Sequence, residues 1–139
     1  MNISTKGRYG LRAILDLAAY GQEQPVALSA IALRQKISAG YLEQLMTPMK
    51  KAGLVQSSRG ARGGYTLARD PRKIIVGDIF RALEGPLALT SCIDEAEEKA
   101  CYLQESCGSR FIWEEIQQAI SRVLSSYTLA DLLEREKIE

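Results

Sequence analysis

All three cysteines of the chain lie in one acidic segment, CIDEAEEKACYLQESC. Cys92, Cys101 and Cys107 have the spacing C-x8-C-x5-C, and the chain contains no histidine. Thiolates are soft metal ligands, and the thiolate is also the form of cysteine that reacts with oxidants. This segment is therefore the first place where the chain could hold a metal or respond to redox conditions.

The spacing of the cysteines limits which metal sites are possible. Structural zinc sites are usually built on C-x2–4-C pairs, and this chain contains none. A ferredoxin-like carrier needs four cysteines, and an odd number does not close a disulfide framework. Considered alone, the residues leave open a cluster with a further ligand, a thiol redox switch, or three reduced thiols.

Length and composition indicate one globular domain. The chain has 139 residues, of which 46% are apolar and 25% are charged. No apolar run approaches the ~20 residues of a membrane span, and the N-terminal residues lack the pattern of a secretory signal. We therefore expect a cytoplasmic protein, in which the thiols stay reduced.

The charges are divided unevenly along the chain. Residues 1–75 contain twelve Lys and Arg and four Asp and Glu, a net charge of +8. Residues 76–139 contain six Lys and Arg and thirteen Asp and Glu, a net charge of −7. A basic first half favours a polyanionic partner. Because the chain lacks histidine, a P-loop and a dinucleotide fingerprint, we expect no enzymatic activity.

Apolar periodicity predicts a mainly α protein with a small β-hairpin. Helices are expected over residues 8–20, 28–37 and 38–53, with Ser38 as the N-cap of the third and a kink at Pro48. Strand-like runs at 54–58 and 64–68 flank a Gly/Arg turn. A helix-turn-helix followed by a hairpin is the order of elements in a winged helix.

The second half is predicted to carry a long helix over residues 110–126. Its apolar residues recur every three or four positions, as in a heptad seam, at Trp113, Ile116, Ile120, Val123 and Tyr127. A helix over 76–83 precedes it, and Thr128 with Asp131 is expected to cap a final short helix. The predicted organisation is a winged-helix domain over 1–84, a cysteine loop over 85–109, and a dimerisation helix with the short helix over 110–139.

The predicted recognition helix is the third one, because the second helix of this motif enters the major groove with its N-terminal residues. Glu43 could accept a hydrogen bond from cytosine N4, and Gln44 could pair with adenine. Glu43 could instead be a solvated residue that pairs with Lys50 or Arg62. The expected contacts are Ser38, Ala39, Gly40, Tyr41, Glu43 and Gln44.

The turn of the hairpin, SRGARGG, carries arginines that suit a narrow minor groove. The alternative is a simple exposed turn, and the charge of +8 favours the DNA contact. We expect Arg59, Gly60 and Arg62 to contact DNA, and Lys6, Arg8, Lys50 and Lys51 to contact phosphates.

Three segments together resemble one family of bacterial regulators. They are MNISTKGRYGLRAILDLA, IALRQKISAGYLEQLMTPMKKAGLVQSSRGARGGYTLAR and VGDIFRALEGP. They are similar to the family that includes IscR, NsrR and CymR, and most similar to the iron–sulfur cluster regulator. The resemblance implies a homodimeric winged-helix repressor of double-stranded DNA, with the long C-terminal helix crossing its partner.

The resemblance also implies an iron–sulfur cluster at Cys92, Cys101 and Cys107, with [2Fe–2S] expected and [4Fe–4S] left open. The family pattern places a histidine three residues after the third cysteine, whereas this chain has Arg110 there. The fourth ligand is therefore open among Glu105, Ser106, Ser109, water and a group from the other subunit. Target genes for cluster assembly are expected by resemblance, with nitric-oxide response and cysteine metabolism as alternatives. A protein of another class, a small redox or cluster carrier whose basic half docks an acidic partner, is a further alternative.

Overall fold

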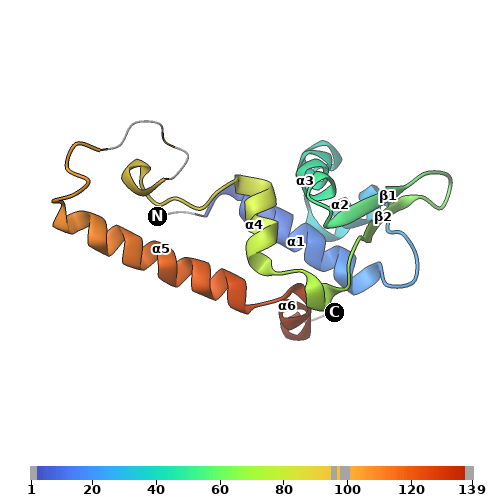
Figure 1. The fold of residues 1–139 in the computed structure, drawn as a ribbon. Coiled ribbons are helices and arrows are strands. Elements are labelled where there is room, and N and C mark those ends of the chain that lie inside the picture. The colour runs from blue at the N-terminus through green and yellow to red at the C-terminus, as the bar shows by residue number, and fades with distance from the viewer. Residues whose placement is uncertain (1–2, 95–96, 98–100, 137–139) are drawn as a thin grey trace.

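The computed structural model describes residues 3–94, 97 and 101–136. In this part of the chain there are six α-helices and one two-stranded hairpin, and the hairpin lies at one end of the molecule (Figure 1). The elements are α1 (Thr5–Tyr20), α2 (Leu28–Gln35), α3 (Ala39–Lys51), β1 (Val55–Ser58), β2 (Gly64–Leu67), η1 (Pro71–Lys73), α4 (Val76–Glu84), η2 (Ser91–Ile93), α5 (Gly108–Ser126) and α6 (Leu129–Arg135). The predicted fold class, a winged helix-turn-helix followed by a long C-terminal helix, is confirmed.

Helix α1 begins at Thr5, earlier than predicted, because Ser4 caps it. The Ser4 hydroxyl accepts a hydrogen bond from the amide of Gly7 at 3.4 Å and donates one to Glu84 at the end of α4. The two helices also approach closely at Gly10, where a Cβ would lie 2.3 Å from the Leu83 Cδ1 atom. A glycine at this position therefore allows α4 to pack against α1.

The turn between α2 and α3 depends on a residue with unusual backbone geometry. Lys36 has φ 55° and ψ 46°, so α2 ends at Gln35, two residues before the predicted end. Ser38 then caps α3 as predicted, accepting a hydrogen bond from the Tyr41 amide at 3.2 Å. The helix continues through Pro48 to Lys51, so the proline does not end it although it lacks an amide donor.

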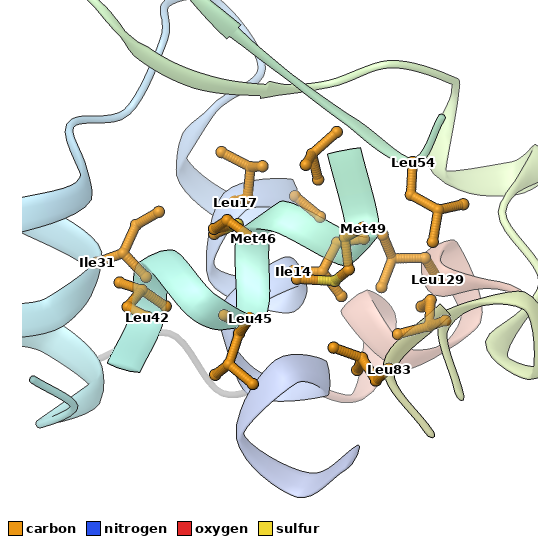
Figure 2. Close-up of a cluster of buried hydrophobic side chains, with 14 of the residues drawn as sticks. Ile14, Leu17, Ile31, Leu42, Leu45, Met46, Met49, Leu54, Leu83 and Leu129 are labelled. Carbon is orange, nitrogen blue, oxygen red and sulfur yellow. The ribbon is translucent and has the colours of Figure 1, made fainter. Parts of the chain in front are cut away.

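The core lies between the first three helices and the elements that pack against them (Figure 2). Helices α1 and α3 contribute most of its fully buried side chains, including Ile14, Leu17, Leu45 and Met46. Each such side chain stabilises the fold by about 1.5–3 kcal/mol relative to its exposed state. Leu129, at the start of α6, is also fully buried in this core. The last helix is therefore part of the winged-helix unit.

Backbone hydrogen bonds fix the junction between α5 and α6. The amide of Val76 donates to the carbonyl of Tyr127 at 3.0 Å, and the amide of Leu129 donates to the carbonyl of Ile74 at 2.8 Å. Thr128 and Asp131 form the predicted capping box. These contacts hold the C-terminal end of α5 against the start of α4.

Helix α5 itself has no buried residue. Figure 1 shows that it extends from the core toward the end of the molecule opposite to the hairpin. Its predicted seam is partly or fully exposed, with Val123 at 54% and Tyr127 at 43%. None of the described helices is long and apolar enough to cross a membrane. Within the described part of the chain, the seam is thus left partly uncovered, most of all at Val123 and Tyr127.

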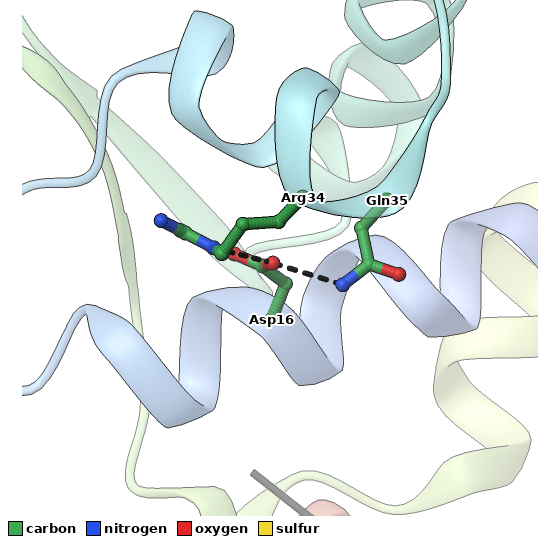
Figure 3. A network of polar contacts seen from close by, with 3 residues as sticks. All are labelled: Asp16, Arg34 and Gln35. Atoms are coloured by element: carbon green, nitrogen blue, oxygen red, sulfur yellow. Dashed lines mark hydrogen bonds and ion pairs between the residues drawn. The ribbon is translucent and has the colours of Figure 1, made fainter. Parts of the chain in front are cut away.

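A buried ion pair joins α1 to α2 (Figure 3). The Asp16 carboxylate is fully buried and accepts two hydrogen bonds from Arg34, at 2.7 and 2.9 Å. Gln35 Nε2 donates a third at 2.9 Å. The Arg34 guanidinium also lies 4.0 Å from the centre of the Tyr20 ring. The pKa of Arg34 is raised, mainly by its hydrogen bond to Asp16.

Removal of either partner of this ion pair is expected to destabilise the fold unequally. Arg34→Ala leaves a buried carboxylate with only Gln35 as donor, so we expect the free energy of unfolding to fall by about 3 kcal/mol. Asp16→Ala leaves an arginine whose side chain is 32% exposed and can hydrate, so we expect a loss of about 1–2 kcal/mol. Urea unfolding measures both, with the surface pair variant Arg72→Ala as control. Equal losses for the two variants would contradict this assignment.

Candidate nucleic-acid interface and cysteine site

The N-terminal end of α3 is open to solvent. Ser38, Ala39 and Gly40 are exposed, and a Cβ added at Gly40 would meet no atom within 4 Å. Tyr41 is only partly exposed, because its ring packs edge-on against Tyr9 of α1 with the ring centres 6.2 Å apart. The first turn of α3 therefore offers small residues and backbone amides to a ligand, flanked by an anchored tyrosine.

Glu43 and Gln44 are exposed one turn further along α3. Glu43 forms no ion pair among the described residues, so the proposed pairing with Lys50 or Arg62 is not found. Lys50 Nζ instead donates a hydrogen bond to Ser57 Oγ at 2.7 Å, which ties the end of α3 to β1. The Glu43 carboxylate is thus left facing solvent.

The hairpin has the predicted form, with each strand one residue shorter than expected. Val55 pairs with Leu67 and Ser58 pairs with Gly64 in antiparallel register. The amide of Gly63 donates to the carbonyl of Gly60 at 2.9 Å, which closes the turn. Arg59, Gly60 and Arg62 are exposed at its tip. In Figure 1 the hairpin and α3 lie at the same end of the molecule.

Strand β2 is held near the turn of the hairpin by the segment before α2. Val26 and Tyr65 exchange backbone hydrogen bonds of 2.9 and 2.8 Å. Gly64 has φ 156°, and a Cβ there would lie 2.2 Å from the Val26 carbonyl oxygen. The orientation of the tip therefore depends on this close backbone approach.

The six cations predicted to meet DNA remain exposed. Among the described residues none of them forms an ion pair; they are Lys6, Arg8, Lys50, Lys51, Arg59 and Arg62. Arg12 was not predicted, yet it lies one turn after Arg8, and its guanidinium carbon is 5.1 Å from the Tyr9 ring centre. Arg8 and Arg12 are four residues apart, which places both on one face of α1. This spacing in the sequence was an available signal for including Arg12 among the DNA-facing cations.

The three cysteines come from three different segments. Cys92 lies in η2, Cys101 in the loop that follows, and Cys107 at the N-cap of α5. All three are free and partly buried. Cys92 Sγ is 3.0 Å from Thr90 Oγ1, and the amide of Leu89 donates to Gln117 of α5 at 3.1 Å. Helix α5 thus holds the segment that carries Cys92.

The environment of Cys107 favours its anionic form. Its pKa is lowered, mainly by the amides of Arg110 and Ser109 in the first turn of α5, with a smaller contribution from the Arg110 charge. Arg110 donates a hydrogen bond from Nε to Glu114 at 2.8 Å. Its pKa is raised, first by that bond, and also by the Glu114 charge and by Cys92 and Cys101. The guanidinium therefore interacts electrostatically with all three cysteines.

The cysteine site suits a metal in the type of its donors. Three thiols are soft ligands, as an iron–sulfur cluster requires. Their arrangement does not form a ligand group, since the described residues contain no set of three His, Cys, Asp or Glu side chains placed to hold a metal. Arg110 cannot complete such a set, because a guanidinium stays protonated and has no acceptor. Glu105, Ser106 and Ser109 are all exposed, and Glu105 belongs to no such group among the described residues.

Comparisons with known proteins agree on one family. A profile of the Rrf2 family, described as iron-dependent transcriptional regulators, matches residues 3–135. Protein rrf2 of Nitratidesulfovibrio vulgaris is 44% identical over 133 residues, which are 96% of this chain and 87% of that protein. The structure of CymR, the global cysteine regulator of B. subtilis, superposes with a TM-score of 0.82 at 43% identity, covering 99% of each chain. The structure of T. potens IscR superposes with a TM-score of 0.79 at 45% identity, covering 100% of this chain and 93% of that chain.

Gly64→Ala is expected to displace the hairpin, because the new methyl group would overlap the Val26 carbonyl. We expect a loss of about 1–3 kcal/mol in the free energy of unfolding and faster proteolysis at the hairpin tip. Gly40→Ala is the matched control, since its methyl group meets nothing and favours the helix. Thermal unfolding of both variants tests this prediction. Equal unfolding temperatures for Gly64→Ala and Gly40→Ala would contradict the close approach at Gly64.

Proposed function

Because this chain belongs to the Rrf2 family of transcriptional regulators, we propose that it is a homodimeric repressor. It binds operator DNA with its winged helix and adjusts that binding through the cysteine site. The observation that carries the proposal is that the six exposed cations on α1, α3 and the hairpin tip form no ion pair among the described residues. Such a surface attracts phosphates without first having to break ion pairs.

In the proposed complex the first turn of α3 enters the major groove. The exposed Ser38, Ala39 and Gly40 permit a close approach of the helix backbone, and the unpaired carboxylate of Glu43 is available to accept a hydrogen bond from cytosine N4. A carboxylate without such an acceptor role would be repelled by phosphate. Glu43 therefore discriminates between base pairs, with Gln44 beside it as a second reader.

The hairpin tip is proposed to enter the neighbouring minor groove. Arg59 and Arg62 are exposed there, and an arginine loses its hydration at low cost in this narrow, electronegative groove. Lys6, Arg8, Lys50 and Lys51 are proposed to contact phosphates, and Arg12 joins them because it shares a face of α1 with Arg8. The close contact between Tyr9 and Tyr41 keeps this basic face of α1 beside α3.

Dimerisation is proposed through α5. The helix has no buried residue in the single chain, and its seam leaves Trp113, Val123 and Tyr127 exposed. A second copy that crosses this helix would cover the seam by heptad packing. The proposed organisation keeps residues 1–84 as the DNA-binding domain, 85–109 as the cysteine loop and 110–139 as the dimerisation segment. Leu129 of the last segment lies in the core of the first, however.

The signal is proposed to act through an iron–sulfur cluster held by Cys92, Cys101 and Cys107, with [2Fe–2S] as the expected type. When bound, such a cluster supplies an oxidant-sensitive centre of variable charge. The fourth ligand comes from an exposed oxygen donor such as Glu105, from water, or from the other subunit. Genes of cluster assembly are the proposed targets, by similarity to the regulator IscR.

A thiol-responsive repressor of the CymR kind is the second candidate. It is favoured by the absence of a metal-ready arrangement among the described residues and by the lowered pKa of Cys107. A reduced thiolate at that position reacts with oxidants without any metal. Nitric-oxide response is a further alternative within the same family. In each case we propose a cytoplasmic, non-enzymatic protein.

Arg59→Ala is expected to weaken DNA binding and to lower the salt slope of binding by about one. Filter binding to random duplex DNA at several salt concentrations measures both quantities. Arg135→Ala, an exposed arginine on α6, is the matched control and is expected to behave as wild type. Unchanged affinity in Arg59→Ala would remove the hairpin from the interface. Wild-type protein without salt-dependent binding would instead support a redox or cluster carrier.

Anaerobically purified protein is expected to show visible charge-transfer bands together with iron and sulfide. Cys92→Ala removes one of the three proposed ligands, so the bands should be lost. Absorption spectra and iron and sulfide assays on the same samples test this expectation. A colourless, iron-free wild-type protein after anaerobic reconstitution would reject the cluster and leave the thiol-responsive repressor.

A further inference from the structure

Gln35, the last residue of α2, joins a buried carboxylate to an exposed arginine. Its side-chain Nε2 donates to Asp16 Oδ2 at 2.9 Å (Figure 3), and its Oε1 accepts a hydrogen bond from Arg12 Nε at 3.2 Å. The amide group is therefore used on both sides, once as donor and once as acceptor. Because the Asp16 side chain is fully buried and is also held by Arg34, the position of Gln35 is fixed from the core.

Arg12 is held more firmly than an exposed arginine usually is. Besides the bond from Nε, its Nη2 atom donates to the backbone carbonyl of Gln35 at 2.5 Å. The guanidinium carbon also lies 5.1 Å from the centre of the Tyr9 ring, within the range of a cation–π contact. Two of its five N–H groups are used in this way. Arg12 is exposed and forms no ion pair among the described residues, so the other three N–H groups remain available to a ligand.

These contacts also tie the guanidinium to the predicted recognition helix. The Tyr9 ring that lies beside it packs edge-on against Tyr41 in the first turn of α3, with the ring centres 6.2 Å apart. Arg8, one turn earlier on α1, lies 5.8 Å from the same ring, and in the described part of the chain its guanidinium makes no hydrogen bond. The two arginines thus share one face of α1, but only Arg12 has a fixed orientation relative to α3.

We propose that Gln35 is a positioning residue for DNA binding: it holds the Arg12 guanidinium ready to contact a phosphate beside the first turn of α3. The inference rests on the proposed function, in which Arg12 belongs to the cations that contact phosphates. An arginine that is free in solvent loses side-chain freedom when it binds, whereas one that is held beforehand has already lost it. Gln35 therefore raises the affinity for DNA without contacting it, and Arg12 fixes the position of the DNA backbone relative to α3.

The proposal predicts that Gln35→Met weakens DNA binding without changing its salt slope. The variant keeps the length of the side chain and removes both hydrogen bonds of its amide, so Arg12 stays charged but becomes free to move. We expect a loss of about 2- to 10-fold in affinity for each chain in the complex. Arg12→Ala should instead lower the salt slope by about one for each chain, because a phosphate contact is lost. Filter binding to random duplex DNA at several salt concentrations measures both quantities.

Two further variants separate positioning from a general effect on the fold. Combining Gln35→Met with Arg12→Ala should cost no more affinity than Arg12→Ala alone, since Gln35 acts through Arg12. Arg12→Lys keeps the charge at an exposed position but lacks the planar fork, so it should show reduced affinity at the wild-type slope, as Gln35→Met does. Gln22→Met is the matched control: its amide donates to the Ala18 carbonyl at 3.3 Å, beyond the other end of α1, and its DNA binding should equal that of wild type.

The outcomes separate this inference from the proposed function. Wild-type protein without salt-dependent binding overturns both. If wild type binds but Arg12→Ala leaves affinity and slope unchanged, this inference alone is wrong. It is also wrong if the losses of Gln35→Met and Arg12→Ala add up in the double variant, because Gln35 then acts only through the stability of the fold. Where Gln35→Met does not fold, Arg12→Lys decides, and wild-type affinity in that variant overturns the inference.

Discussion

The burial of Leu129 against α1, together with the backbone bonds between residues 74–76 and 127–129, anchors the C-terminal end of α5 to the helical core. This anchor matters because α5 buries none of its own residues and is otherwise held by partly exposed contacts with α4 and η2. Because one end is fixed, the direction of the helix is set by the core. The cysteine site at its other end is then placed far from the hairpin, at the opposite end of the molecule (Figure 1).

If the cysteines control DNA binding as proposed, this arrangement limits how a change at them reaches the winged helix. Among the described residues, α5 packs against both α4 and η2, so it forms one physical connection between the cysteine segment and the winged helix. The hydrogen bond between Leu89 and Gln117 ties the linker after α4 to α5. A coupling of about 1–3 kcal/mol in operator affinity is enough for regulation. Coupling of this size requires a packed element with two arrangements, and in the proposed dimer that element is α5.

Sequence reasoning succeeded where the determining interaction is local. The N-cap at Ser38 and the capping box of Thr128 and Asp131 were predicted, because a cap requires only residues within one turn. The end of α2 was predicted two residues late, because a lysine gives no sequence signal for positive φ. The pairing of Asp16 with Arg34 was not predicted, since it depends on how two helices cross. The pair of Arg110 and Glu114 is different: it is local, four residues apart on one helix, and its spacing was a sequence signal that was not used.

The exposed apolar seam of α5 has a consequence in terms of mass action. Where a second copy covers the seam, as proposed, folding and association share the same free energy. The stability of α5 then depends on the concentration of the chain. In the proposed dimer, dilution exposes the seam residues Trp113, Val123 and Tyr127 to water and so favours contact with other surfaces. The amount of this regulator in the cell would thus set its own fraction of assembled dimer, independently of any signal at the cysteines.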